Sequence, residues 1–194
     1  MRILRAAIRV AAPWKNGGGT TFEVASFPEG STLDRFGWRI SLAEVRNSGP
    51  FSIFPGVDRK LAIIEGRLLL AVEGRDVIEL TADSSVVSFP GDAPTNCQPL
   101  APCVTDLNAM TRRGQFSSDM TRYRGEAHQS LTMADPEVIA VIALKPLELR
   151  MAKNRFELGS RDAVLLSRGD GRSIELYPGI HGNDYFVIRI VAAT

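Results

Sequence analysis

Cysteine and histidine are scarce in this chain of 194 residues, which contains only two of each. Cys97 and Cys103 are too few for a disulfide framework or a four-ligand zinc site, so we interpret them as small buried apolar side chains. His128 and His181 have no second histidine or carboxylate at ligand spacing, and neither lies in a recognisable signature of a nucleophilic triad. Zinc-dependent catalysis and serine- or cysteine-based catalysis therefore find no support in the sequence.

An excess of one charge and long hydrophobic runs are missing as well. The 23 basic and 22 acidic residues leave a formal net charge of +1, so no global field draws the protein to nucleic acid or to anionic lipid. No segment approaches the ~18 uninterrupted apolar residues of a membrane span. The N-terminus, with Arg2, Arg5 and Arg9, lacks a secretory apolar region. We expect a cytoplasmic protein whose partners include neither nucleic acid nor a membrane.

Helical patterns are rare, and short strands separated by turn residues dominate the sequence. Only Ser31–Phe36 carries a helical cue, a Ser/Thr cap before a short mixed segment. Strand patterns lie on both sides of a polar stretch from Thr111 to Thr132, and their spacing predicts two antiparallel barrels, residues 1–114 and residues 115–194. The predicted strands are Trp38–Leu42, Lys60–Ile64, Arg67–Val72, Asp76–Leu80, Ser84–Phe89, Glu137–Leu144, Ala163–Ser167, Ser173–Tyr177 and Tyr185–Ala192.

The stretch Pro13–Thr21, with the sequence PWKNGGGTT, has the composition of a binding loop. Three consecutive glycines let backbone amides approach a ligand closely and turn toward one point, which suits an anion. The lysine that follows the glycines in a nucleotide-binding P-loop is missing, so a phosphate cradle is a poor interpretation. A flexible surface turn is the alternative.

The segment Gly49–Arg59 leads directly into an apolar strand and a Glu-Gly turn. This arrangement resembles the first conserved motif of cupin barrels, which in metal-binding cupins carries two histidines one residue apart and a glutamate a few residues later. Here the corresponding positions hold Ser52, Phe54 and Asp58, so a first-row metal would lack its nitrogen ligands. We therefore predict no metal and no cofactor.

Four motifs read together resemble the HutD family and occur in that family's order. They are PWKNGGGTT at 13–21, WRIS at 38–41, GPFSIFPGVDR at 49–59 and DLNAMTRRG at 106–114. The resemblance implies an all-β protein of two fused cupin barrels of the double-stranded β-helix, or jelly-roll, type. It also implies a protein that binds a small carboxylate metabolite, of the urocanate or formylglutamate type, and modulates histidine utilisation. No established reaction comes with the family, so a non-catalytic binding protein is favoured over an enzyme.

The predicted ligand site combines cations with directional hydrogen-bonding groups. Arg39 and Ser41 lie opposite the apolar face of their strand, and Arg59 follows a Pro-Gly turn where a cupin presents its ligands. A guanidinium group matches a carboxylate bidentately, and an inward arginine needs a partner, for which Asp58, Asp106 or a bound carboxylate are candidates. The candidate ligand-binding residues are Lys15, Asn16, Gly17, Gly18, Gly19, Arg39, Ser41, Asp58, Arg59 and Asn108.

Two other classes of function stay open at this point. An isomerase or hydrolase of a related small carboxylate would use Asp58 or Glu65 as general base and Lys15 or Arg59 to stabilise an oxyanion. A protein-binding module that needs no ligand would instead expose a large apolar patch. A homodimer is one alternative for the oligomeric state.

Overall fold

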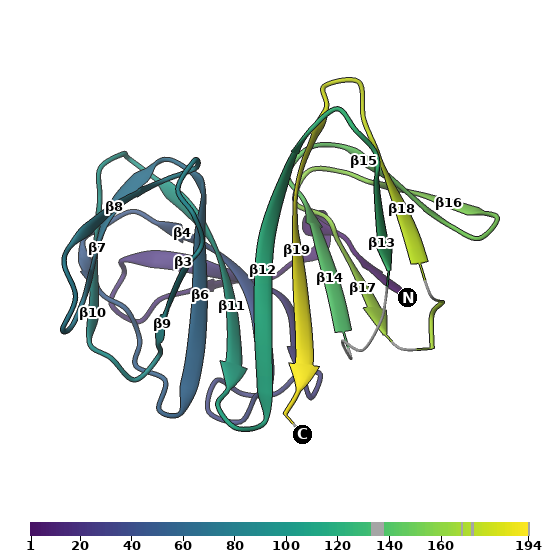
Figure 1. Ribbon diagram of the computed structural model, residues 1–194. Coiled ribbons are helices and arrows are strands. Elements are labelled where there is room, and N and C mark those ends of the chain that lie inside the picture. Colours follow the sequence, from purple (N-terminus) through teal and green to yellow (C-terminus); the bar gives the residue numbers. More distant parts are fainter. Residues whose placement is uncertain (133–137, 168, 172, 194) are drawn as a thin grey trace. The chain divides into compact units, whose positions relative to one another are not determined.

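The protein is nearly all β, as a computed structural model of residues 1–132, 138–167, 169–171 and 173–193 shows (Figure 1). Among these residues the only helical element is the single 3-10 turn η1 (Ala6–Ile8). The prediction of an all-β fold with little helix is confirmed. The described part of the chain contains no helix with the length and apolar character that crossing a membrane requires.

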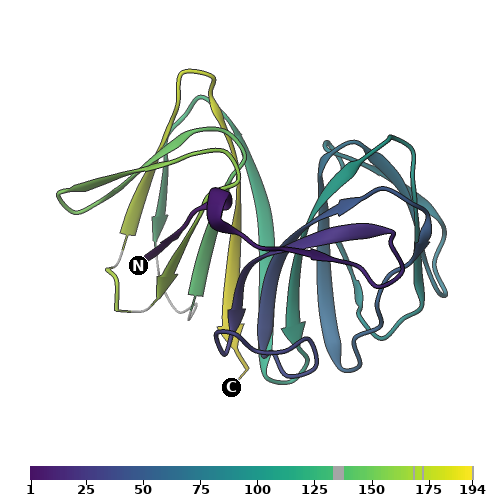
Figure 2. The ribbon, with the colours of Figure 1, turned by 180° about the vertical axis from the view of Figure 1, so that it is seen from behind.

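The chain divides into two compact units, which are described separately below. Residues Arg9–Ser117 form the N-terminal unit, and Met1–Ile8 together with Ser118–Thr194 form the C-terminal unit. The division falls three residues after the predicted boundary at residue 114. The first eight residues, which the sequence assigned to the N-terminal barrel, belong to the C-terminal unit because β1 (Arg2–Leu4) pairs with β17 (Ala163–Ser167) (Figure 2).

The N-terminal unit contains two antiparallel sheets. The six-stranded sheet has the order β2-β3-β4-β11-β6-β9, and the four-stranded sheet has the order β5-β10-β7-β8. Apolar side chains from both sheets, such as Val45, Leu61 and Leu70, form the core. The strands are β2 (Ala11–Pro13), β3 (Gly19–Phe27), β4 (Trp38–Val45), β5 (Gly49–Pro50), β6 (Val57–Glu65), β7 (Arg67–Val72), β8 (Ile78–Thr81), β9 (Val87–Pro90), β10 (Thr95–Pro99) and β11 (Val104–Arg112).

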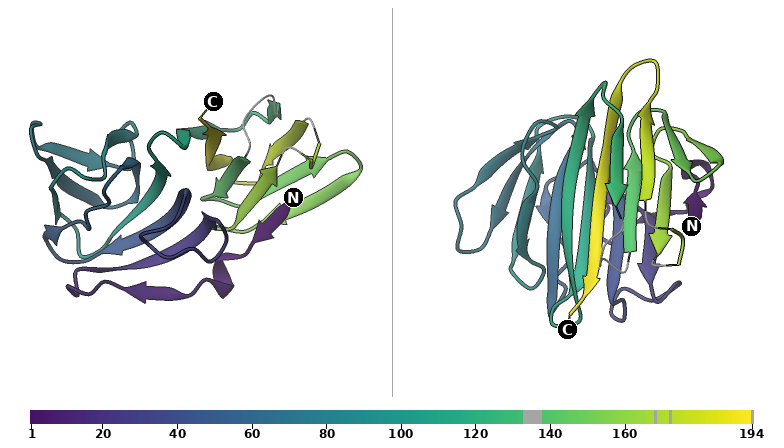
Figure 3. Two further views of the ribbon diagram at one scale, coloured as in Figure 1. Left: turned by 90° about the horizontal axis from the view of Figure 1, so that it is seen from below. Right: turned by 45° about the vertical axis from the view of Figure 1, so that its right-hand side comes forward.

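The C-terminal unit repeats this plan with the sheets β1-β17-β14-β19-β12 and β13-β18-β15-β16. Figure 3 shows the two long strands of the first sheet, β12 in teal-green and β19 in yellow, side by side. Its interior is filled by apolar residues such as Ile139, Leu149 and Tyr185. The remaining strands are β12 (Phe116–Gly125), β13 (Gln129–Thr132), β14 (Val138–Ala143), β15 (Leu147–Met151), β16 (Asn154–Leu158), β18 (Ser173–Pro178) and β19 (Asn183–Ala192).

Two local predictions were wrong. The polar stretch Thr111–Thr132 contains β12 and β13, whose exposed polar faces hide the strand pattern from a hydrophobicity reading. Ser31–Phe36 forms a turn, with the Arg35 amide donating to the Thr32 carbonyl at 3.0 Å, and no helix follows the cap. Glu137, the predicted first residue of a strand, lies outside the described residues, and β14 begins at Val138.

Candidate functional site

The N-terminal unit holds a cavity of about 540 Å³. Its floor is the inner face of the six-stranded sheet, and the segments before β3 and before β6 supply the rest of its wall. Six of the ten predicted ligand-binding residues line it, namely Lys15, Asn16, Arg39, Ser41, Arg59 and Asn108. The other lining residues are Ala12, Pro13, Trp14, Thr21, Leu33, Ala43, Pro50, Phe51, Ser52, Phe54, Asp106 and Met110.

Strand pairing brings the polar residues of the floor together. Successive side chains of a strand point to opposite faces, so alternate residues of β4 and β11 share the inner face. Met110 of β11 lies directly opposite both Arg39 of β4 and Arg59 of β6. Asn108, two residues before Met110 on β11, lies directly opposite Ser41 of β4. The two arginines are therefore separated by a single strand.

Arg59 is the central cation of the floor. Only 7% of its surface is exposed, and its guanidinium carbon lies 5.0 Å from the ring centroids of both Phe51 and Phe89, with Phe54 at 5.9 Å. Cation–π attraction to these rings stabilises the buried charge. Burial lowers the pKa of Arg59 to about 10, which still leaves the side chain cationic at neutral pH.

A buried hydrogen-bonded chain links Arg59 to a carboxyl group. Arg59 Nη2 donates to Asn108 Oδ1 at 2.9 Å, and Asn108 Nδ2 donates to Asp106 Oδ1 at 2.5 Å. Burial raises the pKa of Asp106 to about 7 against the opposing attraction of Arg59. Within the described structure, Arg59 Nε and Asp106 Oδ2 are buried and have no hydrogen-bond partner. A donor and an acceptor thus remain unsatisfied in the cavity floor, which costs stability and is typical of functional sites.

Arg39 has its own counter-ion on the neighbouring strand. Its Nε lies 2.7 Å from Glu23 Oε2 of β3, and the hydroxyl of Ser26 donates to the other oxygen of the same carboxylate at 2.9 Å. The Arg39 side chain is only 10% exposed, whereas that of Glu23 is 39% exposed, so solvent reaches the pair from the glutamate side. Glu23 positions the guanidinium group and balances its charge.

The glycine run does not form part of the cavity lining. Gly18 donates its amide to Oδ1 of Asn16 at 3.0 Å, and Trp14 donates its amide to the carbonyl of Gly19 at 2.9 Å. Gly19 is the first residue of β3, where a Cβ atom would lie 2.4 Å from the Glu44 carbonyl oxygen. The structure therefore replaces the predicted amide nest of Gly17, Gly18 and Gly19 with a turn that needs small residues.

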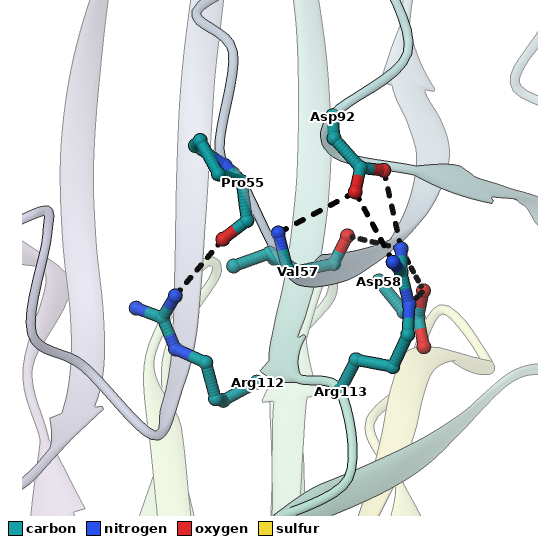
Figure 4. A network of polar contacts seen from close by, with 7 residues as sticks. Pro55, Val57, Asp58, Asp92, Arg112 and Arg113 are labelled. Atoms are coloured by element: carbon teal, nitrogen blue, oxygen red, sulfur yellow. Dashed lines mark hydrogen bonds and ion pairs between the residues drawn. The ribbon is translucent and has the colours of Figure 1, made fainter.

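Asp58 also lies outside the cavity, as part of an exposed ionic cluster (Figure 4). Arg113 donates from Nε to Asp58 Oδ1 at 2.9 Å and contacts both oxygens of Asp92, at 3.1 and 3.2 Å. Asp58 is the first outward-facing residue of β6, and its neighbour Arg59 takes the inward position. Strand alternation allows only one of these two residues to face the cavity, so the structure does not bring Asp58 together with the other predicted site residues.

The same cluster fixes the segment that carries the cavity's aromatic wall. Arg112 donates from Nη1 to the Pro55 carbonyl at 3.0 Å, and from Nη2 to the Asp34 carbonyl at 2.9 Å. The Gly56 amide donates to Asp92 Oδ2 in a long hydrogen bond of 3.4 Å. Arg112 and Arg113 thus hold the segment between Phe51 and Val57 from both sides.

The residues of the cavity do not fit a divalent metal. Asp106 is the only acidic lining residue, and histidine and cysteine are absent from the lining. Throughout the described ranges, no group of three or more His, Cys, Asp or Glu side chains comes together. The positive charges of Lys15, Arg39 and Arg59, which line the cavity, would also repel a metal cation.

Sequence reasoning missed the aromatic and acidic parts of the site. From the sequence, Asp106 is a candidate partner of an inward arginine, a candidate ligand contact or a cap of a turn, and Phe89 is only the last residue of a predicted strand. Asp106, Asn108 and Met110 alternate within one motif, which could have placed all three on the face of Arg39 and Arg59. Phe89 of β9 lies directly opposite Arg59 of β6, and no local sequence pattern predicts this pairing.

Comparison with known proteins first defines the class. Each of the two units is built of two antiparallel sheets, and the N-terminal unit holds a polar cavity. This is the fold of a bicupin. The fold recurs in YlbA of Escherichia coli, with a TM-score of 0.71 at 11% identity over 97% of this chain and 89% of that one, a likeness that shows the fold alone.

The family follows from closer matches. The sequence profile of the HutD family matches residues 6–181, and the chain belongs to that family. An uncharacterized 21.2 kDa protein in the hutC 3' region of Pseudomonas putida is 30% identical over 172 residues, 88% of each chain. A conserved protein of unknown function from Pseudomonas aeruginosa PAO1 superposes with a TM-score of 0.89 at 26% identity over 98% of both chains. HutD from Pseudomonas fluorescens SBW25 gives 0.85 at 24% identity over 100% of this chain and 99% of that one.

Proposed function

We propose that this protein binds a small carboxylate metabolite in the N-terminal cavity, with Arg59 as the principal contact. The observation that carries the proposal is the buried guanidinium group of Arg59 in the cavity floor, whose Nε has no hydrogen-bond partner among the described residues. Arg39 is paired with Glu23, which leaves Lys15 and Arg59 as the cations available to a ligand, and Asp106 is the only acidic residue that the described structure places in the lining. An organic anion would balance this charge, and a cavity of this size is within the range of small-molecule sites.

The geometry of Arg59 supports a carboxylate over other anions. The rings of Phe51 and Phe89 both lie 5.0 Å from the guanidinium carbon of Arg59. Polar contacts with a ligand are therefore made by the N–H groups at the edge of the guanidinium plane. One edge nitrogen already donates to Asn108, and Nε has no partner among the described residues. A planar carboxylate satisfies two such donors at once, which a spherical anion cannot do.

The biological role that we propose is modulation of histidine utilisation. The chain's family and the location of its Pseudomonas putida relative in the hutC region link it to that pathway. Urocanate and formylglutamate are carboxylates of suitable size. Binding of one of them would shift an equilibrium between two conformations, or between free and partner-bound protein, and would thereby report the metabolite's concentration.

An enzymatic role finds less support in the geometry. Neither Asp58 nor Glu65, the two predicted general bases, lines the cavity. Both side chains are exposed, and Asp58 is paired with Arg113. The polar residues that remain in the floor are suited to holding an anion.

Isothermal titration calorimetry with urocanate, formylglutamate and glutamate tests the proposal. We expect at least one ligand to bind below millimolar concentration and Arg59→Ala to abolish that binding. Arg67→Ala is the matched control, because Arg67 is an exposed arginine of the same unit that pairs with Glu79 at 3.3 Å. If no ligand binds, or if Arg59→Ala binds as well as the wild type, the assignment is wrong. NMR of each ligand over hours with the protein would detect turnover, which a pure binding protein does not produce.

A further inference from the structure

Asp106 occupies an unusual position for a carboxyl group beside an anion-binding site. It is 1% exposed, and its single hydrogen bond in the described structure comes from Asn108. The other oxygen, Oδ2, is buried with no partner. The nearest cation that acts on it is Arg59, reached through Asn108. Asp106 and an incoming carboxylate would therefore depend on the same guanidinium charge.

Other charged or titratable groups around Asp106 do not replace Arg59. On β4, Arg39 is paired with Glu23, and Lys15 lies on the loop before β3. On β10, Cys97 is close enough to interact with Asp106, and its pKa is raised to about 11 by burial and by Asp106, so the thiol stays neutral. Asp106 is the group in this floor that can change its charge near neutral pH.

The Asp106 carboxylate and a ligand carboxylate beside the same buried cation repel each other strongly. Charges interact more strongly in the protein interior than in water, because the interior has a lower dielectric constant. One of them can avoid the repulsion by taking up a proton. A ligand carboxylate that is held by the Arg59 edge remains ionised, because the guanidinium charge favours its anionic form. Asp106, which is more deeply buried and lacks a direct hydrogen bond from a cation, is the group that gives up its charge.

We propose that binding of a carboxylate at Arg59 is coupled to protonation of Asp106, so that the ligand replaces Asp106 as the counter-ion of Arg59 and one proton enters from solvent. This inference rests on the proposed function. The proton goes to Oδ2, the oxygen without a partner, while Oδ1 keeps its hydrogen bond from Asn108 Nδ2. No other bond forms or breaks. Affinity then falls as pH rises, because an ionised Asp106 must first be neutralised.

The test is calorimetry with N-formylglutamate, whose own groups do not titrate between pH 6 and 9. Titrations of the wild type at one pH in buffers of different ionisation enthalpy count the protons taken up. We expect an uptake that approaches one proton per ligand between pH 7.5 and 8.5. Affinity should fall by up to about tenfold per pH unit above pH 7, the limit for a single linked proton. NMR of the wild type with ¹³C-labelled aspartate carboxyl groups should show one aspartate becoming protonated on binding.

Two asparagine variants test whether Asp106 is the group that takes up the proton. Asp106→Asn should bind without proton uptake and with an affinity that does not change with pH, because the amide cannot ionise. Asp76→Asn, the same chemical change at an exposed aspartate outside the cavity, should keep the wild-type uptake. If Asp106→Asn does not fold, the wild-type calorimetry and NMR decide the question without it.

The outcomes separate the inference from the proposed function. Binding without proton uptake by the wild type, or uptake that persists in a folded Asp106→Asn protein, overturns the inference and leaves the proposed function standing. Absence of binding by N-formylglutamate, urocanate and glutamate at every pH overturns both. Uptake that Asp106→Asn abolishes and Asp76→Asn retains supports the coupling.

Discussion

Arg59 of β6 and Asn108 of β11 are diagonal neighbours on adjacent strands and are joined by a hydrogen bond of 2.9 Å from Nη2 to Oδ1. Because Asn108 also donates to the acceptor-only carboxylate of Asp106, its amide has one orientation that satisfies both neighbours. The amide oxygen must face Arg59. This relationship holds the guanidinium group in place between its aromatic neighbours and leaves its remaining donors for a ligand.

The first prediction concerns the fork geometry of Arg59. Arg59→Lys keeps a positive charge but cannot donate to Asn108 and a carboxylate in the same plane. We expect carboxylate affinity to fall by roughly 10- to 100-fold, the value of one or two charge-assisted hydrogen bonds of about 1.5 kcal/mol each. Calorimetry measures the affinity, and Arg67→Lys serves as the matched control. Equal affinities of the two variants would show that charge alone attracts the ligand.

The second prediction concerns the ionic cluster of Arg113, Asp58 and Asp92. Arg113→Ala removes the contacts that join the start of β6 to the turn after β9. We expect faster amide hydrogen exchange at Gly56 and Val57 and weaker carboxylate binding, because these residues continue the aromatic wall of Phe51 and Phe54. Arg67→Ala should leave both unchanged. Exchange as slow as in the wild type would mean that the backbone bonds of this segment hold it without Arg113.

Much of the N-terminal site could be predicted from local sequence. The alternation of Trp38–Leu42 places Arg39 and Ser41 on one face, and the structure shows both in the cavity lining. The turn before Arg59 likewise marked the strand that carries it. The alternation of side chains along a strand is a local property, so the residues that share a face can be predicted without knowing which strands pair.

The remaining features depend on pairing between distant segments. Asp58 and Arg59 are adjacent in sequence, and only the register of β6 against β9 and β11 decides which of them faces inward. The short strand β1 has no periodicity of its own, and its place in the C-terminal unit comes from pairing with β17, more than 150 residues away. Such long-range pairings cannot be derived from a single sequence.

The third prediction separates packing from binding in the glycine run. Gly19→Ala places a Cβ atom 2.4 Å from the Glu44 carbonyl oxygen, a backbone atom that cannot move without shifting β4. We expect a loss of about 2 kcal/mol or more in the free energy of unfolding, which is typical of overpacking. Gly18→Ala is the control, because its nearest contact is the end of a side chain, Asn16 Oδ1 at 3.2 Å, and not a backbone atom. Denaturant unfolding of both variants makes the comparison, and equal stability would contradict the close approach of β3 and β4.

The fourth prediction concerns Asp162, which ties the N-terminal residues to the C-terminal unit. Burial alone would raise its pKa, but hydrogen bonds from the Ala6 amide, Arg5 and the Gly159 amide outweigh that effect and lower it. A lowered pKa in the folded state means that the stabilisation is present above pH ~4 and is lost as pH falls through the folded value. Asp162→Asn should therefore cost about 2 kcal/mol at pH 7 and progressively less below pH 4. Denaturant unfolding at both pH values measures the difference, with Asp76→Asn, a change at an exposed aspartate, as control. A cost for Asp162→Asn that stays constant with pH would show that shape, not charge, is what this position requires.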